Sequence, residues 1–454
     1  MKLFGTAGIR GRVDERVTPE LALRVGRAAG QDGNEFVVGH DGRVTSPALA
    51  DGLASGLVSA GVDVVRVGQV PTPALAYASR GRRGVMVTAS HNPPTDNGLK
   101  LFVDGREYGD EAEGRITERV EAGVDTAAWD RWGDSKPETV LPLYRDAVAD
   151  YARQHGGGPE RLTVAVDCGN GMAGVATPQV LRELGAEVVA TEANVDGHFP
   201  ARGSKPTPDT LAQFRSFVAE AGVDLGFAHD GDADRIVVVD DEGGIVHEDT
   251  VVAMLAEHYT RASDAADPVV VTTPNASGRI DERVRAAGGR VERVRLGALH
   301  EGIARERREA GSDDEVTEVV FAAEPWKHVH PAFGGWIDGV ASAAVLTRLL
   351  AAEGLGRRRA AITERPYRKV SVDCPDSHKP AVMAALESAL PDAFPEGDVA
   401  TEHGVRLAFS DGSWALVRPS GTEPYVRLYA ESDDVDALAE RVREVVESAV
   451  EDAR

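Results

Sequence analysis

A strand, helix, strand pattern that occurs three times constrains the fold of this chain more than any other feature of the sequence. Each copy has two short apolar runs separated by a segment of helical periodicity. The copies comprise residues 36–39, 47–61 and 62–67, then 162–167, 175–185 and 186–190, then 269–273, 279–288 and 290–294. A glycine stands where each helix must end before the next strand, at Gly61, Gly185 and Gly288. We therefore expect three related α/β units.

The segment beyond residue 366 has a different pattern. Strand-like and helix-like stretches follow one another at residues 367–372, 379–390, 405–409, 414–418, 425–430 and 435–450. This order indicates an α+β domain. A single core stops growing at roughly 250–300 residues, so a chain of 454 residues needs several domains. Turn-forming and polar residues at 156–159, 262–268 and 354–366 indicate the boundaries. The predicted domains are residues 1–156, 157–262 and 263–362, all α/β, and a smaller α+β domain at 363–454.

The charge balance excludes some classes of partner. The chain has 74 acidic and 50 basic residues, for a net charge of -24. Nucleic acid or an anionic membrane would need a basic face, so neither is expected as a partner. An acidic surface also repels an anionic substrate unless salt screens it. Lysine is rare beside arginine, and two interpretations follow: a protein of a salt-accumulating halophile, which we favour, or an arginine-rich, GC-biased genome.

Neither a membrane span nor a disulfide framework is expected. No apolar stretch approaches the ~18 residues that cross a bilayer, and the first residues run directly into a motif, so we expect a cytoplasmic protein. Cys168 and Cys374 lie far apart and lack metal-ligand spacing. Both are expected to be buried thiols.

A serine follows the apolar run at residues 85–87, in the sequence Thr-Ala-Ser-His-Asn-Pro at 88–93. Such a Ser-His pair is usually only a turn with satisfied side chains. A hydrolase triad is disfavoured, because adjacent residues of an extended chain point opposite ways and no Gly-x-Ser-x-Gly is present. What remains is an exposed serine, Ser90, that could be phosphorylated, with His91 and Lys100 to handle protons and charge.

Alternating carboxylates at Asp230, Asp232 and Asp234 could form an oxygen cage for Mg²⁺ or Ca²⁺. The calcium-loop interpretation fails, because its sixth position needs Gly and is Arg235, and its twelfth needs Glu and is Asp241. A solvated acidic turn stays possible. Because Mg²⁺ normally completes its shell with phosphate oxygens, the loop favours a phosphorylated partner.

The turn Arg-Pro-Ser-Gly-Thr-Glu-Pro at residues 418–424 could bind a phosphate. Its backbone N–H groups, two hydroxyls and two guanidiniums would contact the anion, although a plain β-turn has the same glycine. Together, the serine, the carboxylates and this turn indicate a phosphoryl-transfer site that also holds a second phosphate. No Walker, kinase or dinucleotide fingerprint is present, so the donor is not expected to be a nucleotide.

Four segments resemble the motifs of the α-D-phosphohexomutase superfamily, which includes phosphoglucomutases, phosphomannomutases and phosphoglucosamine mutases. Phe-Gly-Thr-Ala-Gly-Ile-Arg-Gly at residues 4–11 is similar to the N-terminal motif, 88–93 to the phosphoserine loop, 230–235 to the metal loop and 418–424 to the phosphate-binding loop. The order and spacing match over essentially the whole chain. The resemblance implies four domains around a central cleft, the first three sharing one α/β fold.

The resemblance also implies roles for residues. Ser90 would carry the phosphoryl group, and Asp230, Asp232 and Asp234 would hold Mg²⁺ beside it, with Ser90 among the ligands. Arg10, His91 and Lys100 would surround the reacting oxygen. The implied substrate-binding residues are Arg235, Glu324, Trp326, His328, Arg418, Ser420, Gly421, Thr422 and Arg427. The phosphoryl group would pass to a free hydroxyl and give a hexose 1,6-bisphosphate, which turns around before the other phosphate returns to the serine.

The sugar-recognition loop departs from the family pattern Gly-Glu-x-Ser-Gly-His, because residues 323–328 read Ala-Glu-Pro-Trp-Lys-His. Glu324 and His328 match, whereas Trp326 either stacks on the sugar or faces away. Lys327 should repel the ammonium of glucosamine phosphate. We therefore expect a mutase of the phosphoglucomutase/phosphomannomutase type that discriminates weakly between glucose and mannose.

The alternatives are a phosphoglucosamine mutase, favoured by the N-terminal motif, a phosphatase or kinase that uses the same carboxylates, and an inactive sugar-phosphate binding protein. The intact Ser90, Lys100 and acidic loop oppose the inactive form. The sequence predicts no oligomeric state.

Overall fold

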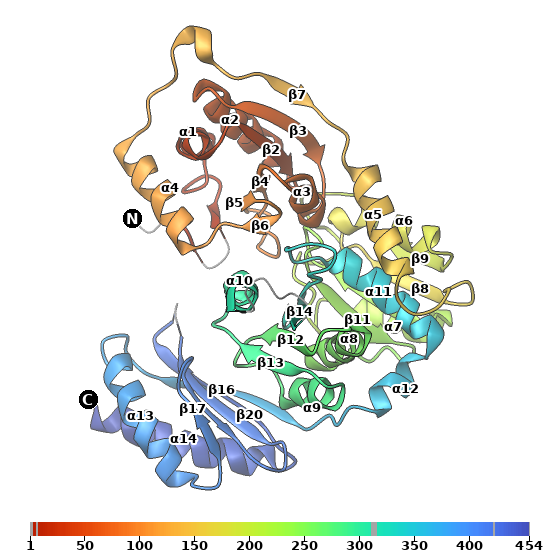
Figure 1. The fold of residues 1–454 in the computed structure, drawn as a ribbon, viewed down its shortest axis with the longest axis vertical. Coiled ribbons are helices and arrows are strands. Elements are labelled where there is room, and N and C mark those ends of the chain that lie inside the picture. Colours follow the sequence, from red (N-terminus) through yellow and green to blue (C-terminus); the bar gives the residue numbers. More distant parts are fainter. Residues whose placement is uncertain (1–2, 6–7, 310–315, 421–422, 454) are drawn as a thin grey trace. The chain divides into compact units, whose positions relative to one another are not determined.

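The computed structural model describes residues 3–5, 8–309, 316–420 and 423–453. The chain forms two compact units. Figure 1 labels their helices and strands. The first consists of residues 1–251 and 326–358, and the second of residues 252–325 and 359–454. Both are mixed α/β, which confirms the predicted fold class. The four-domain division at residues 156, 262 and 362 stays a prediction.

The N-terminal sheet of the first unit has the order β1-β5-β4-β2-β3-β7, and β6 pairs with β5. Its strands are β1 (Ile9–Arg12), β2 (Glu35–His40), β3 (Asp63–Gln69), β4 (Arg83–Val87), β5 (Asp96–Val103), β6 (Arg106–Glu107) and β7 (Ser135–Pro137). β2 is parallel to β3 and β4, so the carboxyl ends of these strands share one edge. The helices of this region are α1 (Pro19–Ala29), α2 (Ser46–Ser59), α3 (Thr72–Ala78) and α4 (Asp110–Ala122).

Glycines bring α1 and α2 into close contact. A Cβ at Gly26 would lie 2.3 Å from the Leu53 carbonyl oxygen, and one at Gly56 would lie 2.2 Å from that of Leu23. Larger residues would therefore force the helices apart. Beneath them, the core combines aliphatic residues of the helices with those of β2, β4 and β5, including Val25, Leu53, Leu57, Phe36, Val38, Val85, Val87 and Leu99.

The other sheet of the first unit has the order β11-β10-β8-β9. Its strands are β8 (Thr163–Asp167), β9 (Glu187–Thr191), β10 (Leu225–His229) and β11 (Ile236–Asp240). β8 is parallel to both β9 and β10, so the direction of winding changes between β8 and β10. Ligands of open α/β sheets bind outside the carboxyl ends of strands at such a point. The acidic loop at residues 230–235 directly follows β10.

Helices surround this sheet, and a later segment of the chain joins them. They are α5 (Leu141–Arg153), α6 (Thr177–Glu183) and α7 (Ala212–Ala221). β15 (Lys327–Val329) and α11 (Gly339–Ala352) also belong to the first unit, where α11 packs against α5 and α6.

The second unit contains parallel strands and a C-terminal antiparallel sheet. β12 (Asp267–Thr272) lies between β13 (Arg290–Arg293) and β14 (Thr317–Glu324), near α9 (Gly278–Ala286) and α10 (Leu299–Glu309). The C-terminal sheet has the order β16-β20-β19-β18-β17. Its elements are β16 (Tyr367–Asp373), β17 (Asp398–Ala400), β18 (Val405–Ala408), β19 (Trp414–Pro419), β20 (Tyr425–Glu431), α13 (Lys379–Ala393) and α14 (Val435–Asp452). The chain passes between the units within α8 (Glu248–Ala262), between residues 325 and 326, and within α12 (Leu355–Ala360).

Most predicted elements are present, with shifted ends. Gly61, Gly185 and Gly288 have φ of 88°, 105° and 95°, which confirms them as left-handed residues after a helix. The helix predicted at residues 175–185 is wrong at its start: a 3-10 turn, Met172–Val175, comes first, and α6 begins at Thr177 with a proline in its first turn. β7 and β17 are too short to give a periodic pattern. Residues 311–315, an acidic stretch that the sequence predicts to be a solvated loop, lie outside the described residues.

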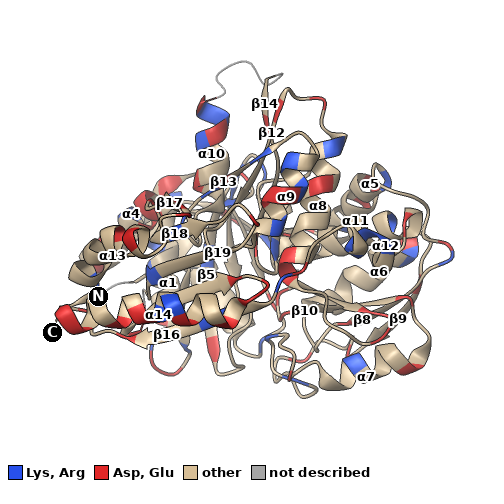
Figure 2. Ribbon diagram, turned by 90° about the horizontal axis from the view of Figure 1, so that it is seen from below, with Lys and Arg blue, Asp and Glu red and all other residues tan. Residues whose placement is uncertain are grey.

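Three further expectations can be compared with the structure. Cys168 and Cys374 are both buried thiols, as predicted. Within the described residues, no helix combines the length and apolarity needed to span a membrane. Acidic residues are frequent in several helices; α14, for example, carries six of them and two arginines (Figure 2).

Candidate active site

Ser90 contacts the acidic loop directly. It lies three residues after β4, and its Oγ donates a hydrogen bond to Asp230 Oδ2 at 2.7 Å. Its backbone N–H donates to Thr88 Oγ1 at 2.8 Å. The expectation of an exposed serine is wrong, because Ser90 is 0% exposed. The acidic loop covers it, and this contact joins the edges of two sheets.

The three carboxylates form a buried cluster that fits a divalent cation. One oxygen from each of Asp230, Asp232 and Asp234 lies within 4.8 Å of the others. Burial raises the pKa of Asp230 well above its ordinary value, and the charges of the other two carboxylates raise it further. The Oδ1 atoms of Asp232 and Asp234 are buried without a hydrogen-bond partner among the described residues. Hard oxygen ligands with spare lone pairs are what Mg²⁺ requires, so these residues fit the metal.

Lys100 holds a permanent charge beside the cluster. Its Nζ lies 2.8 Å from Asp234 Oδ2, 3.8 Å from Asp232 Oδ2 and 3.7 Å from Glu107 Oε1. Burial would lower the pKa of Lys100, but the three carboxylates override this effect and raise the pKa above its ordinary value. The amine is therefore protonated at neutral pH and cannot act as a base there. Its role is to neutralise negative charge.

His91 is neutral, unlike Lys100. Burial lowers its pKa to about 3, and the positive charges of Arg235 and Arg10 lower it further. Arg235 Nε lies 3.5 Å from Asp230 Oδ2 and 3.7 Å from Asp234 Oδ1. His91 Nδ1 and Arg10 Nε are buried without a hydrogen-bond partner in the described part of the chain. These two unsatisfied groups, near the serine and the carboxylate cluster, suit a polar ligand.

Lys327 and Trp326 have different surroundings. The backbones of Lys327 and Arg235 form an isolated antiparallel β-bridge. The charge of Lys327 helps to lower the pKa of Asp234. Trp326 has φ of 72° and packs against an apolar cluster of the second sheet. That cluster includes Leu211, Phe214, Val218, Val237 and Val239. Lys327 therefore acts on the acidic loop, whereas the indole has an apolar neighbourhood.

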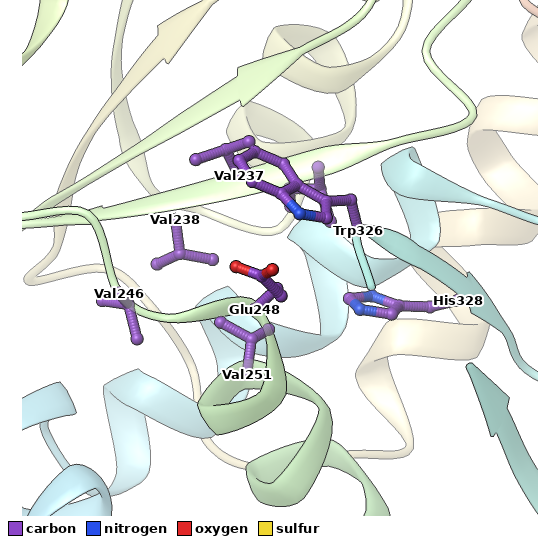
Figure 3. A pocket seen from close by; sticks show the side chains of 8 residues that line it. Val237, Val238, Val246, Glu248, Val251, Trp326 and His328 are labelled. Carbon is purple, nitrogen blue, oxygen red and sulfur yellow. The ribbon is translucent and has the colours of Figure 1, made fainter. Parts of the chain in front are cut away.

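Sequence reasoning did not single out Glu248. Its carboxylate points into a small pocket that Trp326 and His328 also line (Figure 3). Valines of β11 and of the following turn form the apolar side of this pocket. Glu248 begins α8, and nothing in the local pattern separates it from an ordinary acidic residue in the first turn of a helix.

His328 is buried beside a serine hydroxyl. Ser342 Oγ donates to the Asp338 carbonyl at 2.8 Å, and it also lies 3.0 Å from His328 Nδ1 and 2.9 Å from His330 Nε2. Ser342 Oγ therefore lies within hydrogen-bond distance of both imidazoles and of the Asp338 carbonyl oxygen. Burial lowers the pKa of His328 to about 3, so the ring stays neutral.

In the second unit, two arginines suit an anion. Arg418 of β19 and Arg427 of β20 are cross-strand partners, so their side chains lie on the same face of the sheet. Like charges directly opposite each other are unfavourable unless an anion lies between them. Arg418 also donates to the Tyr429 hydroxyl at 3.1 Å, and Arg427 pairs with Glu423 at 3.2 Å. The Nε atoms of both arginines are buried without a hydrogen-bond partner among the residues described.

Hydrogen bonds connect the turn beside these arginines to α13. Lys379 Nζ donates to the carbonyl oxygens of Ser420 and Glu423 at 2.7 and 2.6 Å. Ser420 Oγ accepts the Glu423 N–H at 3.2 Å. Gly421 and Thr422, the other two predicted residues of this turn, lie outside the described residues.

The predicted site residues fall into two groups. The first unit brings together the serine, the three aspartates and the surrounding cations, and it also contains Trp326 and His328. The second unit contains the arginine pair and Glu324, whose Oε1 accepts the Gly297 N–H at 2.6 Å.

Comparison with known proteins gives matches along most of the chain. Residues 1–126 match "Phosphoglucomutase/phosphomannomutase, alpha/beta/alpha domain I", residues 142–243 match domain II, and residues 370–448 match the C-terminal domain of the same family.

Individual relatives align over nearly their full length. "Phosphopentomutase" of Thermococcus kodakarensis is 43% identical, with 95% of this chain and 94% of the relative covered. "Probable phosphoglucosamine mutase" of Methanopyrus kandleri is 41% identical, with 100% of this chain and 99% of the relative covered. A crystal structure of a phosphoglucomutase/phosphomannomutase family protein from Burkholderia thailandensis is 26% identical, with a TM-score of 0.82 over 100% of this chain and 97% of that one. The chain therefore belongs to the phosphoglucomutase/phosphomannomutase family of the α-D-phosphohexomutase superfamily and is an enzyme of the mutase class.

Proposed function

We propose that this enzyme moves a phosphoryl group between O1 and O6 of a hexose phosphate, with Ser90 as the carrier. One observation supports this above all: Ser90 Oγ lies 2.7 Å from Asp230, inside a buried carboxylate cluster that fits a metal. Phosphoryl transfer needs alignment and charge neutralisation more than covalent help. At a buried serine between carboxylates and cations, the fixed position supplies the alignment and the neighbouring cations supply the charge neutralisation.

The proposed roles follow from position and charge. Asp230, Asp232 and Asp234 would hold Mg²⁺, which when bound supplies positive charge to phosphoryl oxygens. Lys100 stays protonated and Arg235 is always charged, so both neutralise the group in transfer. In the forward step the Ser90 Oγ–P bond breaks, the oxygen of the sugar hydroxyl bonds to phosphorus, and the proton of that hydroxyl ends on Ser90 Oγ.

The product of this step is a hexose 1,6-bisphosphate, which must present its other phosphate to Ser90. Arg418 and Arg427 would bind the phosphate that is not reacting, and they must do so in both orientations of the sugar. Bidentate guanidinium contacts suit this task, because they read a phosphate rather than the sugar that carries it. The bisphosphate would therefore act as intermediate and as activator.

For the sugar, we propose neutral hexose phosphates, glucose and mannose. Lys327 puts a positive charge beside the acidic loop, which disfavours the ammonium of glucosamine phosphate. Trp326 replaces a hydroxyl by an indole that cannot accept hydrogen bonds. Selection between glucose and mannose then depends largely on the shape of the sugar, and such selection can change kcat/KM by up to about 200-fold.

A second candidate is phosphoglucosamine mutase. The Glu248 carboxylate, in one pocket with Trp326 and His328, could pair with an ammonium group. The name of the Methanopyrus kandleri relative favours the same sugar, and that of the Thermococcus kodakarensis relative adds pentose phosphates to those worth testing.

Parallel measurement of kcat/KM decides between these sugars. Glucose, mannose, glucosamine and pentose phosphates would be compared in low and high KCl. We expect glucose and mannose phosphates to be within about 200-fold of each other, and glucosamine phosphate to be poorer than both. A far higher value for glucosamine phosphate would overturn the first candidate. Glu248→Gln should then lower that value, whereas Glu118→Gln, at an exposed position of α4, should not.

The same assays test the other reaction classes. A phosphatase would release inorganic phosphate in proportion to substrate consumed, and a binding protein would convert nothing. A mutase converts the sugar phosphate with almost no release. The cytoplasmic location expected from the sequence stays a prediction.

A further inference from the structure

We propose that Arg43 is a positioning residue that fixes the Ser90 loop in the geometry needed for phosphoryl transfer. This rests on the proposed role of Ser90. Arg43 lies in the turn after β2, the strand next to β4, so both turns lie at the same edge of the sheet.

The Arg43 guanidinium binds the backbone of this loop at four points. Nη2 donates to the carbonyl oxygens of Ser90 and Asn92 at 2.8 and 2.7 Å. Nη1 donates to those of Pro93 and Asp96 at 2.6 and 3.0 Å. The side chain is 0% exposed. A planar group with fixed donor directions can hold four carbonyls at once only in one arrangement of the loop.

Asp41 orients Arg43 and connects it to the other side of Ser90. Its Oδ2 accepts from Arg43 Nε at 3.1 Å and from Thr88 Oγ1 at 2.7 Å. Its Oδ1 accepts from Ser46 Oγ at 2.6 Å. Because Thr88 accepts the Ser90 N–H, both backbone groups of Ser90 are tied to Asp41, one through Thr88 and one through Arg43. All five N–H donors of the guanidinium are then used.

Ser90 needs this support because its backbone is left-handed, with φ of 52°. A residue with a Cβ adopts this conformation only when its surroundings impose it. A loop from the second sheet adds to the support: Phe199 lies 5.1 Å from the Arg43 guanidinium, and Ser204 Oγ donates to the Asn92 carbonyl at 2.7 Å.

Packing alone does not explain an arginine here. A buried charge is unfavourable unless it is paired and hydrogen-bonded, and an apolar residue would often fill such a space with equal or greater stability. What an apolar residue cannot do is fix the direction of four carbonyls. Transfer in line between two oxygens depends on that direction, since a misplacement of about 1 Å can reduce the rate about 100-fold.

The test compares Arg43→Lys with Arg279→Lys. Lysine keeps the charge but has its three donors on one atom, so it cannot reproduce the planar guanidinium that binds four carbonyl oxygens at once. Arg279 is a matched control in the second unit, because its side chain is 1% exposed and pairs with Glu431 at 3.1 Å. Two quantities are measured: kcat and KM with the best sugar phosphate, and hydrogen exchange of the peptide covering residues 88–97.

For Arg43→Lys we expect kcat to fall by about 100-fold while KM changes by no more than a few-fold, and exchange in this peptide to rise. Arg279→Lys should change neither, even if both variants lose thermal stability. Unchanged kcat or unchanged exchange in Arg43→Lys would overturn the proposal, and so would equal losses in both variants. If Arg43→Lys does not fold, Asp41→Asn takes its place with the same readouts.

The exchange measurement keeps this proposal separate from the function of Ser90. If the wild-type chain converts no sugar phosphate, the proposed function fails. The hydrogen exchange of residues 88–97 would still show whether Arg43 holds the loop.

Discussion

Ser90, Ala233 and Trp326 share an unusual backbone conformation, with φ of 52°, 61° and 72°. Each lies in a different motif segment: residues 88–93, 230–235 and 323–328. Non-glycine residues persist in the left-handed region only where the surrounding structure holds them, and such residues cluster at functional sites. The sequence identified the three segments, but it could not predict this strain, because serine, alanine and tryptophan do not favour the left-handed region.

His328 predicts a pH dependence of stability. In the folded chain its pKa is lowered to about 3, whereas an unfolded histidine titrates near pH 6.5. Above about pH 6.5 the ring is neutral in both states and contributes no pH dependence. As the pH falls from about 6.5 towards 3, only the unfolded chain gains the proton, so stability falls by up to roughly 1.4 kcal/mol per pH unit.

His328→Gln removes this titration. We expect the variant to lose less stability than the wild-type chain between about pH 7 and pH 5, even if it starts less stable. The measurement is the melting temperature of both chains at each pH. Parallel curves would contradict a buried neutral imidazole at this position.

The acidic loop and the Ser90 loop show what can be predicted at the scale of elements. Each lies just beyond the carboxyl end of an apolar strand, β4 or β10, and the apolar run at residues 85–87 indicated the first of these. Their contact, Ser90 to Asp230, spans 140 residues. Periodicity is local and could not bring the two together, so only the resemblance to a family implied it. The sequence pattern did not indicate Arg43, because Arg43 binds main-chain carbonyl oxygens, and every residue type has these. Knowledge that β2 lies beside β4 would have placed Arg43 at the same edge of the sheet as the Ser90 loop.

Chelation tests whether the acidic loop binds a metal. We expect chelation with EDTA to abolish turnover and Mg²⁺ to restore it, because three buried carboxylates need a cation. A second readout needs no activity: Mg²⁺ should raise the melting temperature, since a ligand that binds only the folded state stabilises it. Asp232→Asn should weaken that rise, whereas Asp241→Asn, at an exposed position after β11, should not. Full activity after exhaustive chelation would exclude the metal.

The chain segments that make up the two units show what could not be predicted for the whole molecule. The repeated pattern predicted the α/β class, because the hydrophobic periodicity of a strand or a helix can be recognised within a short window of sequence. It could not predict that residues 326–358 belong with the N-terminal half of the chain, where Tyr144 donates to Asp338 at 2.8 Å. Which later segment packs on an earlier one depends on tertiary contacts rather than on local periodicity.

The net charge of -24 predicts a response to salt. Self-repulsion among acidic residues should destabilise the folded chain at low ionic strength, and screening should relieve it. We expect the melting temperature to rise from about 0.1 M to about 2 M KCl, with much of the rise coming before the screening length falls to a few Å. A flat or falling curve would favour a genome bias over adaptation to salt.

The central claim is that Ser90 carries the phosphoryl group, and intact-mass spectrometry of the full chain tests it most directly. The chain would be measured as purified and after incubation with a hexose 1,6-bisphosphate. We predict the added mass of one phosphoryl group, located at Ser90 by peptide mapping. The addition should be absent in Ser90→Ala and retained in Ser388→Ala, a change at an exposed serine of α13. An unmodified wild-type chain that turns over sugar phosphates, or a Ser90→Ala chain that still takes up the group, would contradict the account.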